Sequence, residues 1–454
     1  MESQSMLRIA VTNLWTDRNK GDAAINIATI RVIKHCLPHS KIHVFSYYGA
    51  NQMEVAKKEL YLTMQEDIAS FNGGLFPTYD KTEIDMLPKK RTSQKMFTPL
   101  IHSIKTLGTI TFSLLLLVAS RLSLATMLCK VLPYEYRRSL ENFTSSDIVV
   151  IRTNNIREHE SHFFKLYFFY KQFYHAILAI ALRKPFAILN VSIWPIKNIL
   201  SRSLLRWVMN KSALITVREE ISHENLKDLK IKNNKVYVVP DFSFYPISTK
   251  NFEMKPISKE NSHPSIGMVF IDWQEGGATR RRNYINVMTK FIKYLEKFNP
   301  KIVIIPQVDY PPENPAKITE EILRSSGAKN VEIPSENLSM DEHLKLYSKL
   351  DFVIAAPVHA CIFALSVGTP AIGIAYEGGP KHAGLMRMLE MEKYVLPYDN
   401  LTLEKLISLF EEGWQNRLSI HNTGLRNLNL LKEKVLQHGF LLKETCNAIE
   451  IRNI

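Results

Sequence analysis

One histidine stands at the start of an apolar segment that ends in a loop rich in functional groups. The segment APVHACIFALSVGTPAIGIAYEGGPKH, residues 356–382, follows the apolar strand pattern DFVIA, so His359 falls in the first turn of a helix running to about Val367. That end of a helix carries a partial positive charge, and histidine exchanges protons near neutral pH. His359 is a candidate acid, although a lone histidine among apolar residues is more often structural.

The loop after the next strand adds three further functional groups. Beyond AIGIA come the phenol of Tyr376, the carboxylate of Glu377 and the ammonium of Lys381. Together with His359, they offer an acid, an acceptor and a cation at one strand edge. We expect a phosphorylated substrate to bind there.

A second candidate site lies near the N-terminus, in NLWTDRNKGDAAINIATIRVIKHCLP. A strand ends at Asn13 and a helix begins after Gly21, which lets backbone amides face an anion or a polar substrate. Asp22 either stabilises the helix start by ~0.3–1 kcal/mol or binds and deprotonates a sugar hydroxyl. Neither GxGxxG nor GxxxxGK[ST] occurs, so dinucleotide and P-loop sites find no support.

Two charged residues directly follow apolar strand patterns. Arg218, in LITVREEIS, offers a planar fork for phosphate or carboxylate, or it pairs with a neighbouring acid. Asp241, in VVPDFSF, either orients Arg218 or contacts a ligand itself. Strand ends of this kind meet ligands in doubly wound sheets.

Short apolar runs alternate with helical patterns along most of the chain. Such runs are typical of parallel strands covered by helices on both faces. The sequence predicts an α/β protein with two Rossmann-like doubly wound domains facing a central cleft. The predicted parts are an N-terminal domain over 1–247, a linker over 248–263, a second domain over 264–400 and C-terminal helices over 401–454.

An apolar stretch interrupts the N-terminal domain within residues 104–138. The part LGTITFSLLLLVASRLSLATMLCKVL contains two charged residues, Arg121 and Lys130. The apolar run before Arg121 is shorter than the ~20 residues that a membrane-spanning helix needs. It is either a helix lying in a membrane interface, with flanking cations on anionic headgroups, or a buried core helix. A second apolar run over 163–182 reads as an ordinary packed helix.

Composition limits the class of protein and its partners. A chain of 454 residues with 46% hydrophobic residues fits two globular domains. The four cysteines lack CxxC spacing, which predicts no metal site and a reducing, cytoplasmic compartment. A net charge of +14 favours an anionic partner, but its dispersal disfavours nucleic acid.

The ordered motifs KGDAAI, ITVREEIS, VPDFSF, IIPQ and VHACIFALSVGTPAIGIAYEGGPKHAG resemble the polysaccharide pyruvyl transferases. This resemblance implies a two-domain architecture like that of GT-B glycosyltransferases. It also implies transfer of a pyruvyl group from phosphoenolpyruvate to two hydroxyls of a sugar, forming a ketal and releasing phosphate. The acceptors of such enzymes are cell-surface polysaccharides, often lipid-linked at the inner face of the cytoplasmic membrane. Phosphoenolpyruvate is a substrate here, and no cofactor is implied.

The resemblance also assigns roles to the candidate residues. His359 would protonate the methylene carbon of the donor, and Asp22 would hold or deprotonate the acceptor hydroxyl. Donor binding would fall to the residues offering charge or hydrogen bonds near His359 or across the cleft: Arg218, Lys381, Tyr376 and Glu377. Further expected cleft contacts are Asn19, Gly21, Asp241, Gln307 and Arg152.

One position departs from the family pattern and keeps other functions open. The family has Arg-x-His where this chain has Pro357, Val358 and His359, and Arg152 or Arg157 would have to supply the missing charge. The alternatives are a GT-B glycosyltransferase that uses a nucleotide-sugar, and an inactive glycan-binding scaffold.

Overall fold

The structure is a computed structural model that describes residues 6–78, 98–158, 165–248, 250, 252–257, 263–272, 277–310, 314–335, 337–376 and 380–452. Backbone contacts divide the chain into two compact units. Unit 1 comprises Met1–Asp17, Thr29–Val239 and Leu436–Ile454. Unit 2 comprises Arg18–Ala28 and Pro240–Val435. The first turns of the first helix therefore make their contacts in unit 2, although the sequence predicts them within a domain over 1–247.

Unit 1 is built on a parallel sheet with the strand order β3-β2-β1-β4-β6-β7-β8, in which β5 pairs with β6. Its strands are β1 (Arg8–Leu14), β2 (Lys41–Gly49), β3 (Ser70–Gly74), β4 (Ile148–Arg152), β5 (Asn155–Ile156), β6 (Phe186–Ile193), β7 (Leu214–Val217) and β8 (Val236–Val238). The central strands are buried on both faces, as their continuous apolar runs predict.

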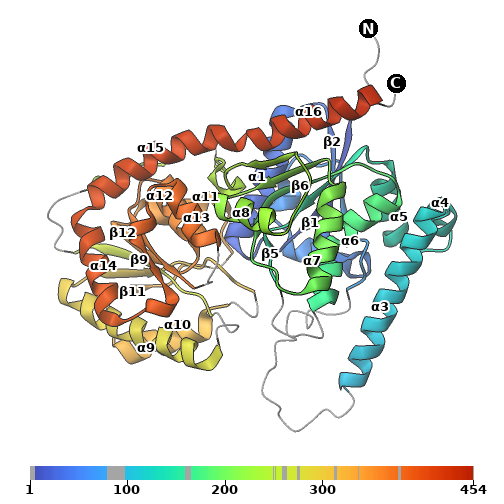
Figure 1. Ribbon diagram of the computed structural model, residues 1–454. Helices are drawn as coiled ribbons and strands as arrows, with labels where there is room; N and C mark the ends of the chain where they lie inside the picture. The colour runs from blue at the N-terminus through green and yellow to red at the C-terminus, as the bar shows by residue number, and fades with distance from the viewer. Residues whose placement is uncertain are drawn as a thin grey trace. The chain divides into compact units, whose positions relative to one another are not determined.

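Helices cover this sheet (Figure 1). They are α1 (Lys20–Cys36), α2 (Met53–Glu59), α3 (Thr98–Arg121), α4 (Ala125–Cys129), α5 (Tyr134–Ser145), α6 (Lys165–Ala181), α7 (Ile199–Lys211), α8 (Glu220–Asp228) and α16 (Gln437–Arg452). The predicted packed helix is α6, whose Phe169, Phe173 and Tyr174 lie in the hydrophobic core. The C-terminal α16 packs on β6 and β7, and its His438 ring hydrogen-bonds with Thr216 Oγ1 at 2.8 Å.

Unit 2 holds a second parallel sheet, with the order β11-β10-β9-β12-β13-β14. Its strands are β9 (Ser265–Val269), β10 (Lys301–Ile304), β11 (Val331–Glu332), β12 (Phe352–Ala355), β13 (Ala371–Ala375) and β14 (Val395–Pro397). Its helices are α9 (Gly277–Leu295), α10 (Ala316–Ser326), α11 (Met340–Ser348), α12 (Val358–Ser366), α13 (Pro380–Met388), α14 (Leu403–Gln415) and α15 (Arg417–Val435), with α9 and α10 side by side (Figure 1).

Both sheets have a point at which the strand order reverses. It lies between β1 and β4 in unit 1 and between β9 and β12 in unit 2. Ligands of doubly wound sheets bind beside such points, at the carboxyl ends of the strands. The two Rossmann-like sheets predicted from the sequence are thus confirmed, and they define where each unit's site belongs.

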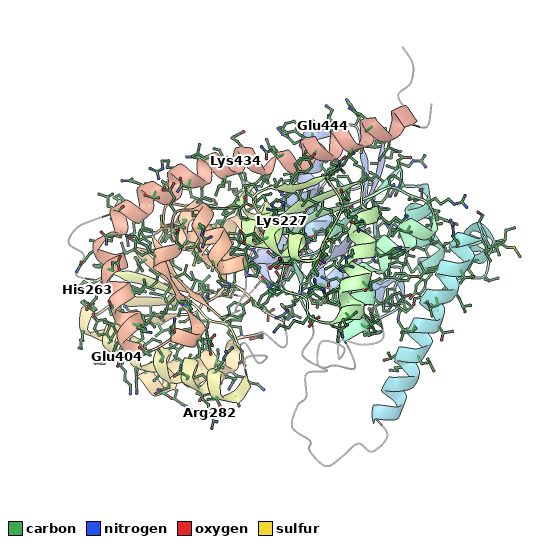
Figure 2. All side chains as sticks on the ribbon, viewed as in Figure 1. Lys227, His263, Arg282, Glu404, Lys434 and Glu444 are labelled. Carbon is green, nitrogen blue, oxygen red and sulfur yellow. The ribbon has the colours of Figure 1, made fainter. Side chains whose placement is uncertain are left out.

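Charged side chains are spread over both units. Figure 2 labels Lys227 on α8 of unit 1, and Arg282 on α9 and Lys434 on α15 of unit 2. Within the described part of the chain, no helix has both the length and the hydropathy needed to cross a bilayer.

Candidate active site

His359 lies at the strand-order reversal of unit 2. It occupies the first turn of α12, directly after β12, and Pro357 precedes the helix in an extended conformation. The side chain is 5% exposed, so it is buried but reaches the edge of the unit's surface. This placement confirms the predicted position of His359 in the fold.

The segment containing the KGD motif packs directly against this histidine. A methyl group at Gly21 would lie 2.1 Å from Nδ1 of His359, a distance that no Cβ tolerates, so only glycine lets the backbone approach the imidazole. Lys20 N donates to the carbonyl of Gln307 at 3.0 Å, and Arg18 pairs with Asp309 at 3.0 Å. These contacts hold the segment on the carboxyl end of β10.

The start of α1 is held by Asn19. Its Oδ1 accepts from the backbone N–H of Gly21 at 3.0 Å, and its carbonyl accepts from Ala23 N at 2.9 Å. Asp22 follows in the first turn and is 6% exposed. Unit 2 therefore brings together four residues predicted from two separate motifs: Asn19, Gly21 and Asp22 from the first, and His359 from the second.

A buried polar cluster supports the other side of this segment. Gln307 Oε1 accepts from His343 Nε2 at 2.9 Å and from the Tyr347 hydroxyl at 3.3 Å. Burial, and to a lesser extent the nearby charge of Lys20, lowers the pKa of His343 to about 3, so the ring is neutral. Lys20 Nζ donates to the carbonyl of Leu338 at 2.7 Å.

Sequence reasoning missed His343 and Tyr347. Both lie on α11, which the sequence predicts as a helix, but 36 and 40 residues separate them from Gln307. Among the described residues, Gln307 Nε2 and His343 Nδ1 are buried donors or acceptors without a hydrogen bond. Such groups are costly unless a ligand or water satisfies them, which makes this cluster part of the candidate site.

The loop after β13 is tied to the start of α12 by a second histidine. His382 Nε2 donates to the carbonyl of Ala356 at 3.0 Å, and its ring lies edge-on to Tyr376 with centroids 5.3 Å apart. Lys381 is half-buried in the first turn of α13. Glu377 lies outside the described residues. Tyr376 and Lys381 thus follow the strand next to β12, and His382 is a positioning residue that the sequence did not single out.

Arg218 is enclosed by unit 1 at the carboxyl end of β7. Its side chain is fully buried, and its guanidinium donates to Ser192 Oγ at 2.9 Å, to Asn155 Oδ1 at 3.0 Å and to the carbonyl of Asn154. It joins the loop after β4 to β6. Arg152, which ends β4, is also buried. Donor binding by either arginine stays a prediction.

A polar network connects the strand ends around the reversal point of unit 1. Asn13 adopts a left-handed conformation with φ 63° at the end of β1, which asparagine tolerates better than most residues. Its amide donates to the carbonyl of Gln172 at 2.9 Å and its Oδ1 accepts from His175 at 2.9 Å. Gln172 in turn donates to Thr153 Oγ1 at 2.6 Å. The network joins the end of β1 and the loop after β4 to helix α6.

Asp241 belongs to unit 2 and caps a short helical turn. Its fully buried carboxylate accepts from the backbone N–H of Ser243 at 2.7 Å, at the start of the 3₁₀ turn Phe242–Phe244. Capping of this turn is a structural reason for an aspartate at position 241. Ligand binding by Asp241 stays a prediction.

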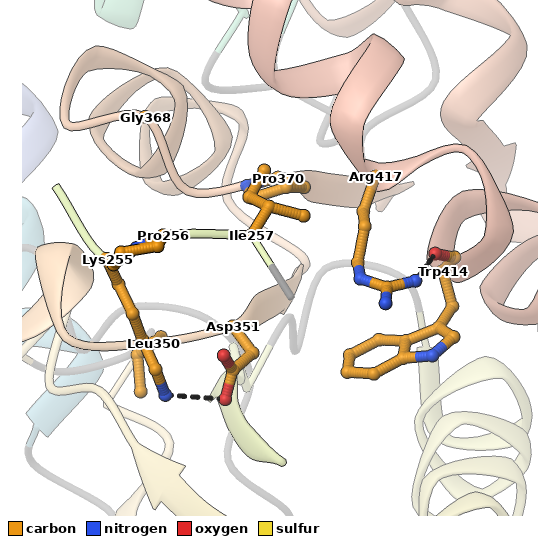
Figure 3. A pocket seen from close by; sticks show the side chains of 9 residues that line it. All are labelled: Lys255, Pro256, Ile257, Leu350, Asp351, Gly368, Pro370, Trp414 and Arg417. Atoms are coloured by element: carbon orange, nitrogen blue, oxygen red, sulfur yellow. Dashed lines mark hydrogen bonds and ion pairs between the residues drawn. The ribbon is translucent and has the colours of Figure 1, made fainter. Parts of the chain in front are cut away.

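A small pocket in unit 2 lies at the opposite ends of the strands from His359 (Figure 3). Lys255 pairs with Asp351 at 2.7 Å, just before β12, and the guanidinium of Arg417 lies 4.6 Å from the Trp414 ring. Asp351 and Pro370 precede β12 and β13, so the pocket is at the amino ends of the strands. Doubly wound sheets bind ligands at the opposite ends, and we do not assign a substrate to this pocket.

The described residues contain no group of three or more histidine, cysteine, aspartate or glutamate side chains arranged to bind a metal. The cysteines Cys36, Cys129, Cys361 and Cys446 are all buried and free.

Solved structures similar to this chain share its two-domain fold. UDP-GlcNAc 2-epimerase from Neisseria meningitidis has a TM-score of 0.52 and 15% identity, over 95% of this chain and 100% of that one. Sucrose-phosphate synthase from Thermosynechococcus elongatus has a TM-score of 0.53 and 11% identity, over 97% of this chain and 100% of that one. The lipopolysaccharide outer core galactosyltransferase WaaB has a TM-score of 0.51 and 11% identity, over 96% of this chain and 98% of that one. At such low identity, these matches show the GT-B fold alone, as expected.

Sequence comparison identifies the family. No curated protein matches the chain significantly. The sequence profile of a family described as polysaccharide pyruvyl transferase matches residues 19–378. This span includes Asn19, Asp22 and His359, whereas Lys381 and His382 lie beyond its end. Because this match covers most of the chain, the chain belongs to the polysaccharide pyruvyl transferase family.

Proposed function

We propose that this chain transfers a pyruvyl group from phosphoenolpyruvate to two hydroxyls of one sugar in a cell-surface polysaccharide. The observation that supports this function is the packing of His359 on Gly21, which sets an imidazole beside the helix start that carries Asp22. An acid and a carboxylate next to a helix N-terminus suit the proton transfers and the anionic donor of this reaction.

The proposed chemistry balances with these groups. His359 gives a proton to the methylene carbon of phosphoenolpyruvate, and the first sugar hydroxyl, losing its proton to Asp22, bonds to the adjacent carbon. The bond from that carbon to the phosphate oxygen then breaks, and the departing phosphate takes the proton held by Asp22. The second hydroxyl attacks the same carbon to close the ketal and gives its proton to His359, which restores both side chains. The products are the ketal and inorganic phosphate, and no further cofactor takes part in this proposal.

Donor binding is proposed for the cations and hydrogen-bonding groups near the strand ends: Lys381, Tyr376, Glu377, Arg218 and Arg152. Pro357 replaces the arginine that the family generally has two residues before its histidine. This replacement favours one second candidate, a transferase on the same fold that takes a nucleotide-sugar instead of phosphoenolpyruvate.

We further propose that the acceptor is lipid-linked and that the enzyme works in the cytoplasm, at the inner face of the cytoplasmic membrane. A net charge of +14 suits a protein that works beside anionic lipid.

Phosphate release from phosphoenolpyruvate, measured with the purified full-length chain and a membrane glycolipid extract, tests the proposed function. We expect His359→Gln and Asp22→Asn to lower the rate by about 10²–10⁴-fold, the usual contribution of a general acid or base. His35→Gln and Asp67→Asn are matched controls, because both side chains are exposed; they should keep the wild-type rate.

Two outcomes would contradict the proposal. One is an unchanged rate in folded His359→Gln. The other is no release by wild type with a complete extract, together with consumption of a nucleotide-sugar, which would establish the second candidate.

A further inference from the structure

Helix α3 of unit 1 exposes its apolar face. We name as the outer face the exposed apolar side chains of α3, of α4 and of the segments after each. They are Leu107, Leu114, Leu115, Val118, Leu122, Leu124, Met127 and Val131. The first five recur at helical spacing and share one side of the helix. Val131 is 77% exposed and Leu115 62%, so the described residues of unit 1 leave this face uncovered.

The opposite side of α3 packs on protein through small polar side chains. Thr109, Ser113 and Ser120 are buried there, together with Leu116. The Ser113 hydroxyl lies 2.9 Å from that of Tyr170 on α6. Three hydroxyls thus face the protein while four leucines and a valine face outward beside one exposed hydroxyl, Thr111, which differs from the usual pattern of a helix that faces water. This difference indicates that the outer face meets an apolar medium.

The charges of α3, of α4 and of the segments after each are basic, whereas Glu135 and Glu141 follow on α5. From Thr98 to Tyr134 the sequence contains no acidic residue, whereas Lys105, Arg121 and Lys130 are basic. Arg121 and Lys130 are exposed beside the leucines. Tyr134 is also exposed, with the guanidinium of Arg137 at 5.8 Å from its ring. Apolar side chains edged by cations and tyrosine match the boundary between acyl chains and anionic headgroups.

We propose that the outer face inserts into the headgroup–acyl boundary of an anionic lipid bilayer. Because one side of α3 is packed on α6, the helix lies along the membrane surface. A second copy of the chain fits less well, since a twofold contact would bring Arg121 and Lys130 toward their own copies, and neither α3 nor α4 carries an acid to pair with them. The proposal deepens the proposed function, because it names the surface that would hold the enzyme beside a lipid-linked acceptor.

Vesicle flotation with the full-length chain tests the proposal. We expect the protein to float with vesicles of equal phosphatidylglycerol and phosphatidylcholine, and far less with phosphatidylcholine alone. The double variant Leu115→Asn, Val118→Asn should lower the partition coefficient by about tenfold or more. The matched control is Ile199→Asn, Leu200→Asn on α7, where two equally exposed apolar side chains lie outside the outer face.

A second variant avoids any effect on helix packing. Arg121→Glu, Lys130→Glu leaves the apolar side chains intact and should weaken flotation on the anionic vesicles alone. Wild-type flotation of both folded variants, or equal flotation of wild type on the two vesicle types, would overturn the proposal. So would a dimer of the wild-type chain that becomes a monomer in Leu115→Asn, Val118→Asn while vesicle binding is absent throughout.

Activity on two acceptors separates this proposal from the proposed function. With an oligosaccharide released from its lipid, the Leu115→Asn, Val118→Asn variant should release phosphate at the wild-type rate; with the membrane-bound acceptor it should be slower. Absence of activity on both acceptors in wild type would contradict the proposed function and leave the flotation result to decide the membrane proposal.

Discussion

The closest constraint on the candidate site is the contact between one glycine and one imidazole. Gly21 and His359 are far apart in sequence, and the space between them is too small for a Cβ. The imidazole orientation therefore depends on a position that performs no chemistry itself. Residues without functional groups matter here because they set where the acid points.

Replacement of this glycine tests that dependence. In Gly21→Ala the new methyl group displaces His359 or the start of α1, and such overpacking costs about 1–3 kcal/mol. We expect a lower melting temperature and a loss of phosphate release larger than the loss of stability explains. Gly108→Ala is the control, because a methyl group there meets nothing within 4 Å; it should keep activity on a soluble acceptor. Wild-type activity of Gly21→Ala would contradict the close packing.

Two buried histidines predict how stability changes with pH. Burial lowers the pKa of His175 in unit 1 and of His343 in unit 2 to about 3 each. The unfolded chain binds these protons near the ordinary pKa of histidine, so between that value and about 3 it holds more protons than the native protein. The free energy of unfolding should therefore fall as the pH falls through this window.

Urea denaturation between about pH 7 and about pH 5 measures this slope, which is at most about 1.4 kcal/mol per pH unit for each histidine. His175 Nε2 accepts from Leu75 N while Nδ1 faces Asn13 Oδ1, a pairing that glutamine can replace. His175→Gln should be less stable near neutrality but show a shallower slope. An unchanged slope would show that His175 binds its proton in the native protein as readily as in the unfolded chain, which would contradict the lowered pKa.

At the scale of elements, helix α11 determines where the buried cluster lies. Its start is a capping box, in which Ser339 Oγ accepts from Glu342 N and the Glu342 carboxylate accepts from Ser339 N at 2.9 Å. The residue before the cap, Leu338, accepts from the ammonium of Lys20. The cap thus fixes both the helix that carries His343 and the carbonyl that holds the KGD segment.

Removal of this cap should weaken unit 2. Ser339→Ala leaves backbone donors without their partner, at a cost of about 0.5–2 kcal/mol. Chemical denaturation should show a lower midpoint with an unchanged slope. Ser335→Ala is the comparison, since that exposed serine lies before the helix and outside its cap, where its hydroxyl accepts from Asn337 N at the long distance of 3.3 Å. Equal midpoints for the two variants would mean that the capping box adds nothing to stability.

At the scale of the whole molecule, charge governs how the protein meets anionic surfaces. The net charge of +14 is spread over both units rather than gathered in one groove. Long-range attraction of this kind is screened by salt, whereas apolar insertion is not. The two contributions to membrane binding can therefore be separated.

We expect flotation on anionic vesicles to fall steeply between about 0.1 M and about 0.5 M salt, where the screening length shrinks well below 10 Å. The Leu115→Asn, Val118→Asn variant should lose nearly all binding at high salt, whereas wild type keeps the part due to the outer face. Identical salt curves for the two proteins would indicate that charge alone attracts this chain to membranes.

Local patterns in the sequence determined the elements that carry the candidate residues. The runs DFVIA and AIGIA became β12 and β13, because fully buried parallel strands are recognisable as continuous apolar runs, and the helix expected between them became α12. Strand β3 was missed, since SFNGG has two glycines and no such run. The family motifs could also be recognised, because they are short stretches that follow one another in a fixed order along the sequence.

Contacts between distant residues were decided only by the tertiary structure. No pattern shows that Arg18–Ala28 packs in unit 2, that Gln307 accepts from His343, or that Arg218 is enclosed by unit 1. The same holds for α3, since only the structure shows that Thr109, Ser113 and Ser120 are buried while Leu114, Leu115 and Val118 are exposed. A sequence specifies which residues are apolar or reactive, but packing decides which of them meet, because burial depends on partners that lie far along the chain.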